Sequence, residues 1–539
     1  MFKSGIDSNS VPIQTQRAGS SFTFRKCRFS QVALPVLFSL FLIPNIIFFS
    51  FEGLLGRSAV LVLALLAAGV LATYVWKSAT KMESGDGLSI TVIATCFAAA
   101  LVLCLLGGQG RIFYANLDWQ VRYPLYHDIV THPWPFKYAI GSQNQFLVLR
   151  APVGIYLLPA VSAKLLGSNY ENATFLLQNT IILGILLALV ASLFKRKKRI
   201  YALIIFIFFG GMEIVGYSIR VALSGHGFHP DHIEIWSRFY EYSSMITLVF
   251  WTPHHCFPGI AAGLLYAMWY RKRIPVSVLL ALVPVIALWS PFAFMGVLPF
   301  ALHATIASLK SGERPGTVFL APLVTGSLCL LPIVYLRSGI SGVRWTLGLM
   351  QNTAFSWHLM LMAGVTYVLF IALQVLPFLL ILLWKGRYRV SIPGICLMSA
   401  ILFVFPFIHV GEGLDFCMRA SIPAITIMAI EIIETLFSLQ ENKRNNSDRY
   451  AFVALLGILC LGSVTALLEI RRAITHAPVQ TTGCNFVDGW NASAFRTISY
   501  DTYLANEKAM PAVFQLGTAS VIRTGLTRPC WSGDWYNPL

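Results

Sequence analysis

The sequence predicts an all-α fold, a polytopic membrane helix bundle of about thirteen transmembrane helices. Three observations support this class. Only 12% of the 539 residues are charged, 56% are hydrophobic, and the mean hydropathy is +0.69, a combination that excludes a soluble chain of this length. Apolar stretches long enough to cross ~30 Å of hydrocarbon recur along the chain. Lysines and arginines gather in alternate connections between these stretches.

Each apolar stretch is expected to cross as a helix, because lipid offers no partners to backbone N–H and C=O groups. Residues 151–166 are also apolar. We interpret them as a helix on the outer interface that does not cross, since counting them as a span would reverse the sidedness of the basic connections. The predicted spans are residues 32–51, 59–76, 88–106, 174–194, 200–219, 246–270, 275–291, 293–309, 317–335, 359–384, 391–408, 420–437 and 451–470.

The basic connections predict the orientation, because lysine and arginine favour the cytoplasmic side. Arg471 and Arg472, just outside the last span, are exceptions to this pattern. Topology and attraction to anionic membrane lipids then explain the net charge of +17, and no basic soluble domain indicates a nucleic-acid partner. The basic segments placed on the cytoplasmic side are residues 25–28, 195–199, 271–273, 385–389 and 443–449.

This topology divides the chain into three parts. Residues 1–31 form a basic cytoplasmic N-terminus, residues 32–470 form the transmembrane domain, and residues 471–539 form a C-terminal tail on the outer side. The outer face also holds a first large loop, residues 107–173 with the interfacial helix, and a second loop, residues 220–245. Because the long polar segments lie on this face, we expect an active site there.

The tail carries two features that bear on function. Cys484 and Cys530 are placed to pair if that side is oxidising. Its aromatic side chains either offer flat faces to a sugar or only cap the outer face. They are Trp490, Tyr500, Trp531, Trp535 and Tyr536.

The first outer loop carries the carboxylates best placed for chemistry at the membrane surface. Asp118 follows a predicted span closely enough to lie at the depth of lipid phosphates. A carboxylate there can take the proton of an acceptor hydroxyl or hold a cation against a phosphate, and Asp128 is a second candidate for catalysis. Trp119 and Tyr123 are candidates for substrate contact. Alternatively, Asp118 forms a salt bridge with Arg122, and Asp128 pairs with a neighbouring histidine.

The second outer loop carries candidate metal ligands, His229, Asp231 and His232. Imidazole and carboxylate groups suit Zn²⁺ or Mn²⁺, whereas Mg²⁺ prefers oxygen ligands, so the cofactor expected here is a divalent cation, Mg²⁺ or Mn²⁺. The spacing fits no fixed motif, and the alternative is a solvated polar loop. Glu213, in the outer half of the fifth span, is expected to face the bundle interior as a partner for a cation or a histidine.

Two further groups lie where outer connections meet spans. His254 and His255 follow Pro253 near the outer end of the sixth span, which predicts a break in the helix. We expect these histidines either to bind a donor phosphate or sugar or to form polar contacts between helices. Arg419 begins the twelfth span on the side that disfavours arginine, where a guanidinium can clamp a phosphate. Asp415 is a further candidate for substrate contact. Alternatively, Arg419 pairs with Asp415 at the interface.

The order of these parts resembles the GT-C superfamily, integral-membrane glycosyltransferases that use polyprenyl-phosphate sugars. The resemblance rests on Asp118 in the first outer loop, the segment 150–167 and the span that returns inward, and its layout covers about residues 88–440. Short motifs, Asn116-x-Asp118-Trp119 and Asp415-Phe-x-Met-Arg419, look like those of an uncharacterised bacterial multispanning branch. Many members carry paired acids in the first loop, whereas Asn116 replaces one here, which leaves metal dependence open.

The resemblance implies a glycosyltransferase of the bacterial inner (plasma) membrane, with a cytoplasmic N-terminus and a periplasmic C-terminus. It would transfer a sugar from a polyprenyl-phosphate-linked donor to a periplasmic glycan or lipid acceptor with inversion, and Asp118 would act as the base. One alternative is a transporter or flippase of lipid-linked sugars, which predicts polar residues at the midplane and on both faces. Another is a ligase or polymerase of the O-antigen type, which would use arginines of the outer loops.

Overall fold

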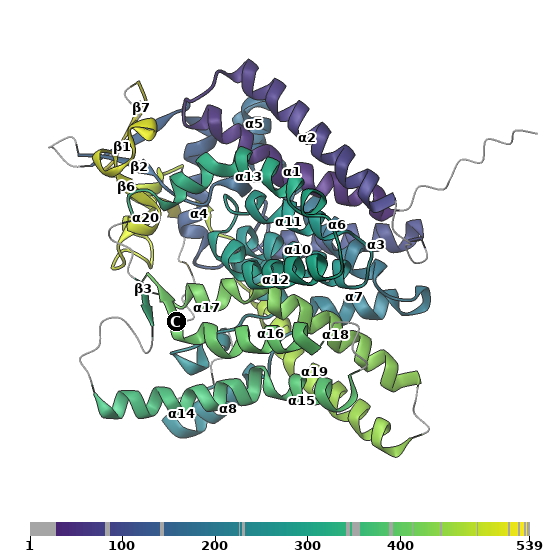
Figure 1. The fold of residues 1–539 in the computed structure, drawn as a ribbon. Helices are drawn as coiled ribbons and strands as arrows, with labels where there is room; N and C mark the ends of the chain where they lie inside the picture. Colours follow the sequence, from purple (N-terminus) through teal and green to yellow (C-terminus); the bar gives the residue numbers. More distant parts are fainter. Residues whose placement is uncertain are drawn as a thin grey trace, which may run out of the picture.

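The computed structural model is mostly helical (Figure 1). Among its described residues, eight helices are long and apolar enough to cross a membrane, and five shorter apolar helices accompany them. A polytopic helical protein is therefore confirmed at this coarser level. The structure describes residues 29–80, 87–140, 145–225, 227–228, 232–340, 345–347, 356–386, 392–411, 413–441, 445–481, 483–515, 518–525, 529–532 and 535.

Every predicted span overlaps one helix or two consecutive helices, although the span 391–408 also runs through a 3-10 turn into a short strand. The helices are α1 (Phe29–Phe51), α2 (Arg57–Thr80), α3 (Ile90–Leu106), α4 (Trp119–Thr131), α5 (Gly154–Leu166), α6 (Glu171–Ser192), α7 (Arg199–Ile207), α8 (Glu213–Ser224), α9 (Met245–Trp251), α10 (Pro253–Tyr270), α11 (Val276–Val285), α12 (Pro291–Lys310), α13 (Pro315–Arg337), α14 (Trp357–Gln374), α15 (Leu376–Lys385), α16 (Ile392–Val404), α17 (Asp415–Ala420), α18 (Ile422–Glu441), α19 (Asn446–Thr475) and α20 (Phe486–Ala492).

The fifth, sixth and tenth predicted spans are each divided into two helices. Gly210 and Gly211 lie in the break between α7 and α8, where two glycines in a row weaken the helix. Pro253 is the first residue of α10 and Pro377 the second residue of α15, where a proline cannot donate the N–H that would continue the preceding helix. Irregular backbone at membrane depth is tolerated where protein buries it. The predicted break before His254 and His255 is therefore confirmed.

The segment predicted as a helix at 151–166 is observed as α5, and its place on the outer interface stays a prediction. Its 13 residues give a length of roughly 20 Å, compared with ~30 Å for the hydrocarbon core. The helix packs against α1, α4 and α6. Gly154 at its start lies directly against the Trp289 ring, so a larger side chain there would collide with the indole.

The basic connections meet at one end of the bundle, the basic end. Lys198, between α6 and α7, contacts the Glu441 carboxylate at the end of α18, with an Nζ–Oε1 distance of 2.7 Å. Arg273, after α10, donates to the Ser192 carbonyl at the end of α6 at 2.6 Å. Which side of the membrane this end faces stays a prediction.

Arg472, an exception to the charge pattern, is buried at the opposite end. Its guanidinium pairs with Glu469 on the same helix and lies 5.0 Å from the centre of the Trp251 ring. A buried and paired arginine makes a tertiary contact, so it is not a signal of which side a loop faces.

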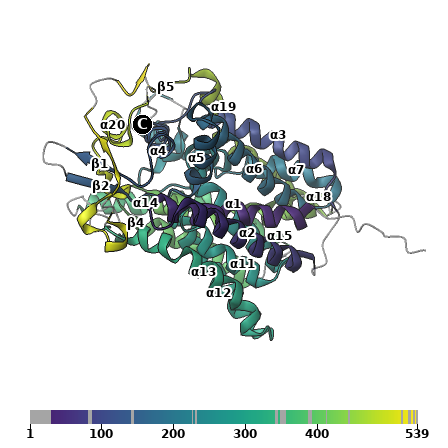
Figure 2. The same ribbon diagram turned by 90° about the horizontal axis from the view of Figure 1, so that it is seen from above.

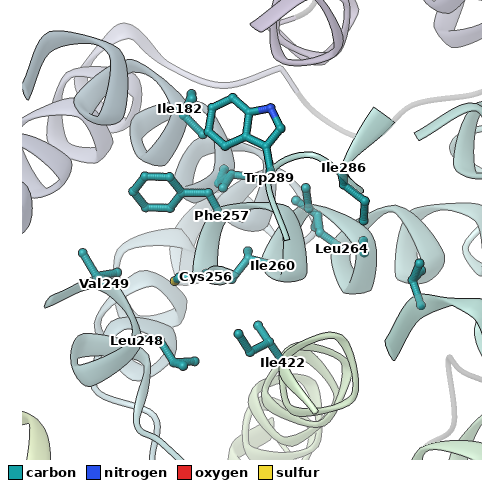
Figure 3. Close-up of a cluster of buried hydrophobic side chains, with 14 of the residues drawn as sticks. Ile182, Leu248, Val249, Cys256, Phe257, Ile260, Leu264, Ile286, Trp289 and Ile422 are labelled. Carbon is teal, nitrogen blue, oxygen red and sulfur yellow. The ribbon is translucent and has the colours of Figure 1, made fainter. Parts of the chain in front are cut away.

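The centre of the core is α10, which is apolar on all sides and surrounded by α6, α9, α11, α12 and α18. Figure 3 shows Phe257, Ile260 and Leu264 of α10 packed with side chains from these neighbours. Gly259 and Gly263 lie within close range of α18, where a Cβ would approach Ile422 and the Pro423 carbonyl to 2.5 Å. Small residues therefore let the two helices approach closely, and the histidine pair begins a rigid, central helix.

A four-stranded sheet forms the end opposite the basic end, at the left of Figures 1 and 2, which we call the sheet end. The order is β6-β2-β1-β7, in which β1 runs parallel to β7 and the other neighbours are antiparallel. The sheet joins the first outer loop to the tail. Its strands are β1 (Phe136–Ile140), β2 (Gln145–Leu149), β6 (Leu504–Asn506) and β7 (Ser520–Arg523); the remaining strands are β3 (Trp345–Leu347) with β4 (Ile408–Val410), and β5 (Gln480–Thr481) with β8 (Trp531–Ser532).

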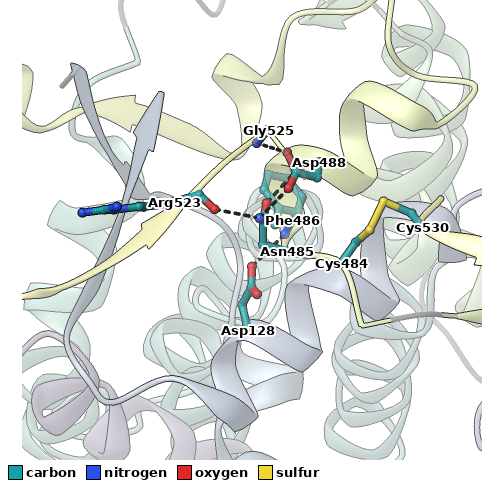
Figure 4. Close-up of a disulfide and its surroundings, with 8 residues drawn as sticks. All are labelled: Asp128, Cys484, Asn485, Phe486, Asp488, Arg523, Gly525 and Cys530. Atoms are coloured by element: carbon teal, nitrogen blue, oxygen red, sulfur yellow. Dashed lines mark hydrogen bonds between the residues drawn. A yellow bond between two sulfur atoms is a disulfide. The ribbon is translucent and has the colours of Figure 1, made fainter. Parts of the chain in front are cut away.

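A disulfide closes the tail on itself, and a hydrogen bond holds the tail to the first outer loop (Figure 4). Cys484 and Cys530 form a disulfide, so the predicted pairing is confirmed. The Asp128 carboxylate accepts hydrogen bonds through Oδ2 from the Phe486 backbone N–H at 2.7 Å and from the Tyr138 hydroxyl at 2.8 Å. The loop and the tail therefore form one unit, which we call the outer unit.

Candidate functional site

Two adjacent histidines lie at the start of α10, under the outer unit. The break at Thr252 turns the chain so that His254 and His255 are both buried, with ring centres 3.9 Å apart. The His254 Nδ1 atom is 2.8 Å from Nη1 of Arg122 in α4. The His255 Nε2 atom is 3.2 Å from Nη1 of Arg419 in α17. The pair thus receives one guanidinium from each side.

These contacts assign the protonation of the two rings, because a guanidinium can only donate hydrogen bonds. His254 accepts at Nδ1 and His255 accepts at Nε2, so His255 carries its hydrogen on Nδ1. That Nδ1 lies 2.6 Å from the Ser290 hydroxyl, which caps α12. The arginines keep the positive charges of the site, and the histidines orient them.

Each guanidinium also pairs with a carboxylate four residues before it. The distance from Asp118 Oδ2 to Arg122 Nη2 is 2.6 Å, and that from Asp415 Oδ1 to Arg419 Nη2 is 2.7 Å. Asp118 occupies the N-cap position of α4, but its side chain does not cap the helix. Both salt bridges named as alternatives in the sequence analysis are therefore present, and they lie within one site.

The two pairs border a cavity of about 340 Å³, the larger cavity. Asp118, Arg122, Asp415 and Arg419 all line it. A carboxylate of the first outer loop and the arginine of the twelfth predicted span thus share one cleft. The remaining lining comes from the second outer loop, the break before α10, the segment before α17, and the tail.

A smaller cavity of about 170 Å³ adjoins the larger one. The two share Asp415, Arg419 and Tyr503 in their walls. His254, His255 and Arg150 line the smaller cavity together with a largely apolar wall. That wall consists of Pro152, Pro291, Phe292, Met295, Leu336 and Ile340.

Unused hydrogen-bond donors lie at the smaller cavity. Arg150 donates through Nη1 to the Leu336 carbonyl at 3.2 Å and through Nη2 to the Asp501 carbonyl. The buried Nε atoms of Arg150 and Arg419 have no hydrogen-bond partner within the described part of the chain. A buried donor without a partner costs free energy, so an anion that accepts from these groups would be stabilised here.

Arg150, Glu241 and Tyr503 line the cavities but were not among the predicted site residues, and Arg122 was named only as a partner of Asp118. Glu241, which precedes α9, lines the larger cavity as a third carboxyl, and burial raises the pKa of this group. The sequence analysis placed candidate metal ligands in this loop, including two histidines, and gave no role to Glu241. Tyr503 lies in the walls of both cavities. It is one aromatic residue among many in the tail, so no sequence signal distinguishes it.

Some predicted site residues line neither cavity. Asp128 is fully buried at the base of the tail. Trp119 and Tyr123 are buried residues of α4. Trp119 Nε1 donates to the Phe250 carbonyl at 3.0 Å, and the Tyr123 hydroxyl donates to the Gly108 carbonyl at 2.6 Å. They therefore position α4. Glu213 lies inside the bundle, where its carboxylate accepts from the Thr465 hydroxyl at 3.1 Å.

The predicted metal group is found only in part. His232 lines the larger cavity, but its Nδ1 is 3.2 Å from Glu469, and its ring stacks on Trp251 with centres 4.5 Å apart. His229 and Asp231 lie outside the described residues. Among the described residues, no three histidine, cysteine, aspartate or glutamate side chains converge as metal ligands. We therefore derive no step through a cation.

Comparison with known proteins returns no family model, no curated protein and no solved structure that matches the chain.

Proposed function

We propose that the chain is a GT-C-type membrane glycosyltransferase that transfers a sugar from a polyprenyl-phosphate-linked donor, with inversion, to a glycan or lipid acceptor. One observation carries the proposal. Asp118 and Arg419 line the same cavity, and Arg419 also lines the smaller cavity, where guanidinium donors are unused. A base and an anion-binding group therefore line the same pair of adjoining cavities.

The smaller cavity suits the phosphate of the donor. The guanidiniums of Arg150 and Arg419 line it, and His254, which accepts at Nδ1, carries its hydrogen on Nε2. Charge-assisted hydrogen bonds to phosphate are among the stronger polar contacts in proteins. The apolar wall from α12 and α13 suits the first isoprene units of the carrier.

Asp118 suits the base because it lines the larger cavity and not the smaller one. In the proposed step the acceptor oxygen forms a bond to the anomeric carbon and gives its proton to the Asp118 carboxylate. The bond from that carbon to the phosphate oxygen breaks, and the phosphate keeps the electron pair. Arg419 and Arg150 stabilise the charge that develops there. Attack from the side opposite to the phosphate inverts the anomeric centre.

The proposal places the sheet end in the bacterial periplasm and the basic end in the cytoplasm, with about thirteen crossings. The disulfide of the outer unit supports this placement, because disulfides persist in oxidising compartments. Three of the shorter apolar helices, α3, α11 and α16, and the two divided spans α7–α8 and α9–α10 would supply the five crossings beyond the eight long helices.

A transporter of lipid-linked sugars is the second candidate. Divided helices with buried ionisable groups are typical of transporters, and Glu213 at the break between α7 and α8 is such a group. Against this candidate, both cavities described above lie at the sheet end, under the outer unit.

The test measures transfer from a radiolabelled polyprenyl-phosphate sugar by the purified protein in liposomes. Asp118→Asn should lower kcat by about 10²–10⁴-fold, because the amide cannot take the proton. Glu313→Gln, at an exposed carboxylate between α12 and α13, is the matched control and should keep the wild-type rate. Thermal unfolding should show that both variants fold.

Full transfer by a folded Asp118→Asn variant would remove this residue from the base role. If wild-type protein moved the labelled carrier between leaflets without transferring sugar, the transporter would be correct.

A further inference from the structure

One wall of the larger cavity comes from the tail, at residues 490–503. The Trp490 ring lies between two others in contact, with its centre 6.0 Å from that of Phe495 and 5.5 Å from that of Tyr503. Phe495 and Ile498 are partly exposed and line the cavity. The sequence analysis named Trp490 among several tail aromatics, and within the described residues the structure brings Trp490 to the cavity but not Trp531 or Trp535.

This wall is held in a defined position. The Trp490 indole N–H donates to the Ile498 carbonyl at 3.0 Å, which closes the segment on itself. The Ala494 backbone N–H donates to the Gln120 side chain of α4 at 2.9 Å, only two residues beyond Asp118. The position of the segment is therefore fixed relative to α4, whose N-cap residue is the proposed base.

The larger cavity is also lined by many hydrogen-bond acceptors. Asp118, Asp415 and Glu241 present carboxyl groups, and Ser243 and Thr247 carry hydroxyls. Such groups accept hydrogen bonds from hydroxyls. The flat faces of Phe495 and Tyr503 suit the C–H surface of a ring.

The charge of this cavity disfavours an anionic ligand. Each of its two guanidiniums is already paired with a carboxylate, and Glu241 adds a third carboxyl that lacks an arginine of its own among the described residues. The apolar wall suited to a lipid chain belongs to the smaller cavity. The larger cavity thus combines acceptors and ring faces without a surplus of cations.

We propose that the acceptor is a neutral carbohydrate, the end of a glycan chain, and that Phe495 and Ile498 of the tail determine its selection. This inference rests on the proposed function and deepens it, because it names the acceptor class. Hydroxyls of the acceptor would bind the carboxyl groups, and its ring would pack against the tail wall.

The test uses the full-length protein in liposomes with the radiolabelled donor. Three acceptor pools from the cell envelope are compared: neutral oligosaccharides, acidic oligosaccharides and a lipid extract. Label should enter the neutral pool. The double variant Phe495→Ala with Ile498→Ala should raise the KM for that pool by roughly tenfold or more, while kcat changes by less than about threefold.

Donor hydrolysis by water, measured without acceptor, separates this inference from the proposed function. It should be equal in the wild type and the double variant, because the donor site is untouched. Val513→Ala, at an exposed tail residue that lines neither cavity, should leave the acceptor KM unchanged.

Transfer into the acidic pool or the lipid extract would overturn the inference and leave the proposed function standing. So would an unchanged acceptor KM in the double variant, or hydrolysis of the donor with no label in any pool. If the wild type neither transfers sugar nor hydrolyses the donor, the proposed function itself is wrong.

Discussion

Single residues of the site work in two matching sets. Asp118 and Arg122 form one set, Asp415 and Arg419 the other, and each arginine donates to one of two adjacent histidines. Because each guanidinium is bound in two directions, its plane is fixed before any ligand arrives. A preorganised donor spends little free energy on reorientation when charge develops beside it.

Asp128 is a single residue whose ionisation affects the stability of the fold. Burial raises the pKa of its carboxyl to about 7, although hydrogen bonds from Phe486 and Tyr138 lower it. The unfolded chain has an aspartate pKa of about 3.9. Between these values the folded protein binds more protons than the unfolded one, so this group's contribution to stability falls as the pH rises from about 4 to about 7.

Asp128→Asn should remove this pH dependence, because the amide oxygen still accepts both hydrogen bonds and does not titrate. The difference in Tm between wild type and variant, measured in detergent from about pH 5 to about pH 8, should shift in favour of the variant as the pH rises. Asp128→Ala is the control: it should lower Tm at every pH, because the Phe486 N–H loses its partner. A constant difference for the asparagine variant would contradict the assignment.

At this scale, several site residues and the two Asp–Arg pairs at a spacing of four residues were predictable, whereas the contacts between helices were not. Asp118, Arg419, Asp415, His254 and His255 stand out because ionisable side chains are rare beside apolar spans. Their convergence depends on how α4, α10 and α17 pack, which no local pattern encodes. The same packing brings Glu241 and Tyr503 into the site, and no pattern in the sequence around them predicts this.

At the element scale, close backbone approaches hold the divided helices. Gly462 in α19 lies against the break between α7 and α8, where a Cβ would come within 2.2 Å of the Gly210 carbonyl. In lipid, helix association depends on such tight packing, because apolar burial gains little between helices. The break is thus stabilised by a neighbour far away in the sequence.

Gly462→Ala should therefore destabilise the protein by about 1–3 kcal/mol, because the added methyl forces the two segments apart. Gly457→Ala on the same helix meets nothing within 4 Å and should leave stability unchanged or slightly higher. Thermal unfolding in detergent compares the two variants. Equal Tm values would show that the close approach contributes nothing to stability.

At the scale of the whole molecule, the outer unit covers the site. The disulfide closes a sequence separation of 46 residues, for which the loss of chain entropy in the unfolded state corresponds to about 4 kcal/mol. Replacing Cys484 and Cys530 with serine should raise protease sensitivity of the tail and lower transfer, since residues 490–503 form a wall of the larger cavity. Cys256→Ser, at a buried free cysteine of α10, is the control and should leave the tail protected. A tail equally protected in the disulfide variant would contradict this role.

Sidedness is also a property of the whole molecule. A cysteine at Val521, exposed on β7, should react with a membrane-impermeant maleimide added to intact spheroplasts. A cysteine at Lys197, exposed at the basic end, should react only after the membrane is opened. The reverse labelling would place the site in the cytoplasm and exclude a periplasmic acceptor.

The sequence alone determined the class of the molecule, its helical stretches and the shared side of its basic connections. These follow from the amino-acid composition, the length of the apolar stretches and the positions of lysine and arginine, all of which can be read locally along the chain. Tertiary structure alone decided the sheet and the cavities. Strands β1 and β2 find partners in β6 and β7 more than 350 residues later, and the Asp–Arg pairs meet across α10. Contacts at such separations depend on the free energy of the packed whole, which a local pattern does not contain.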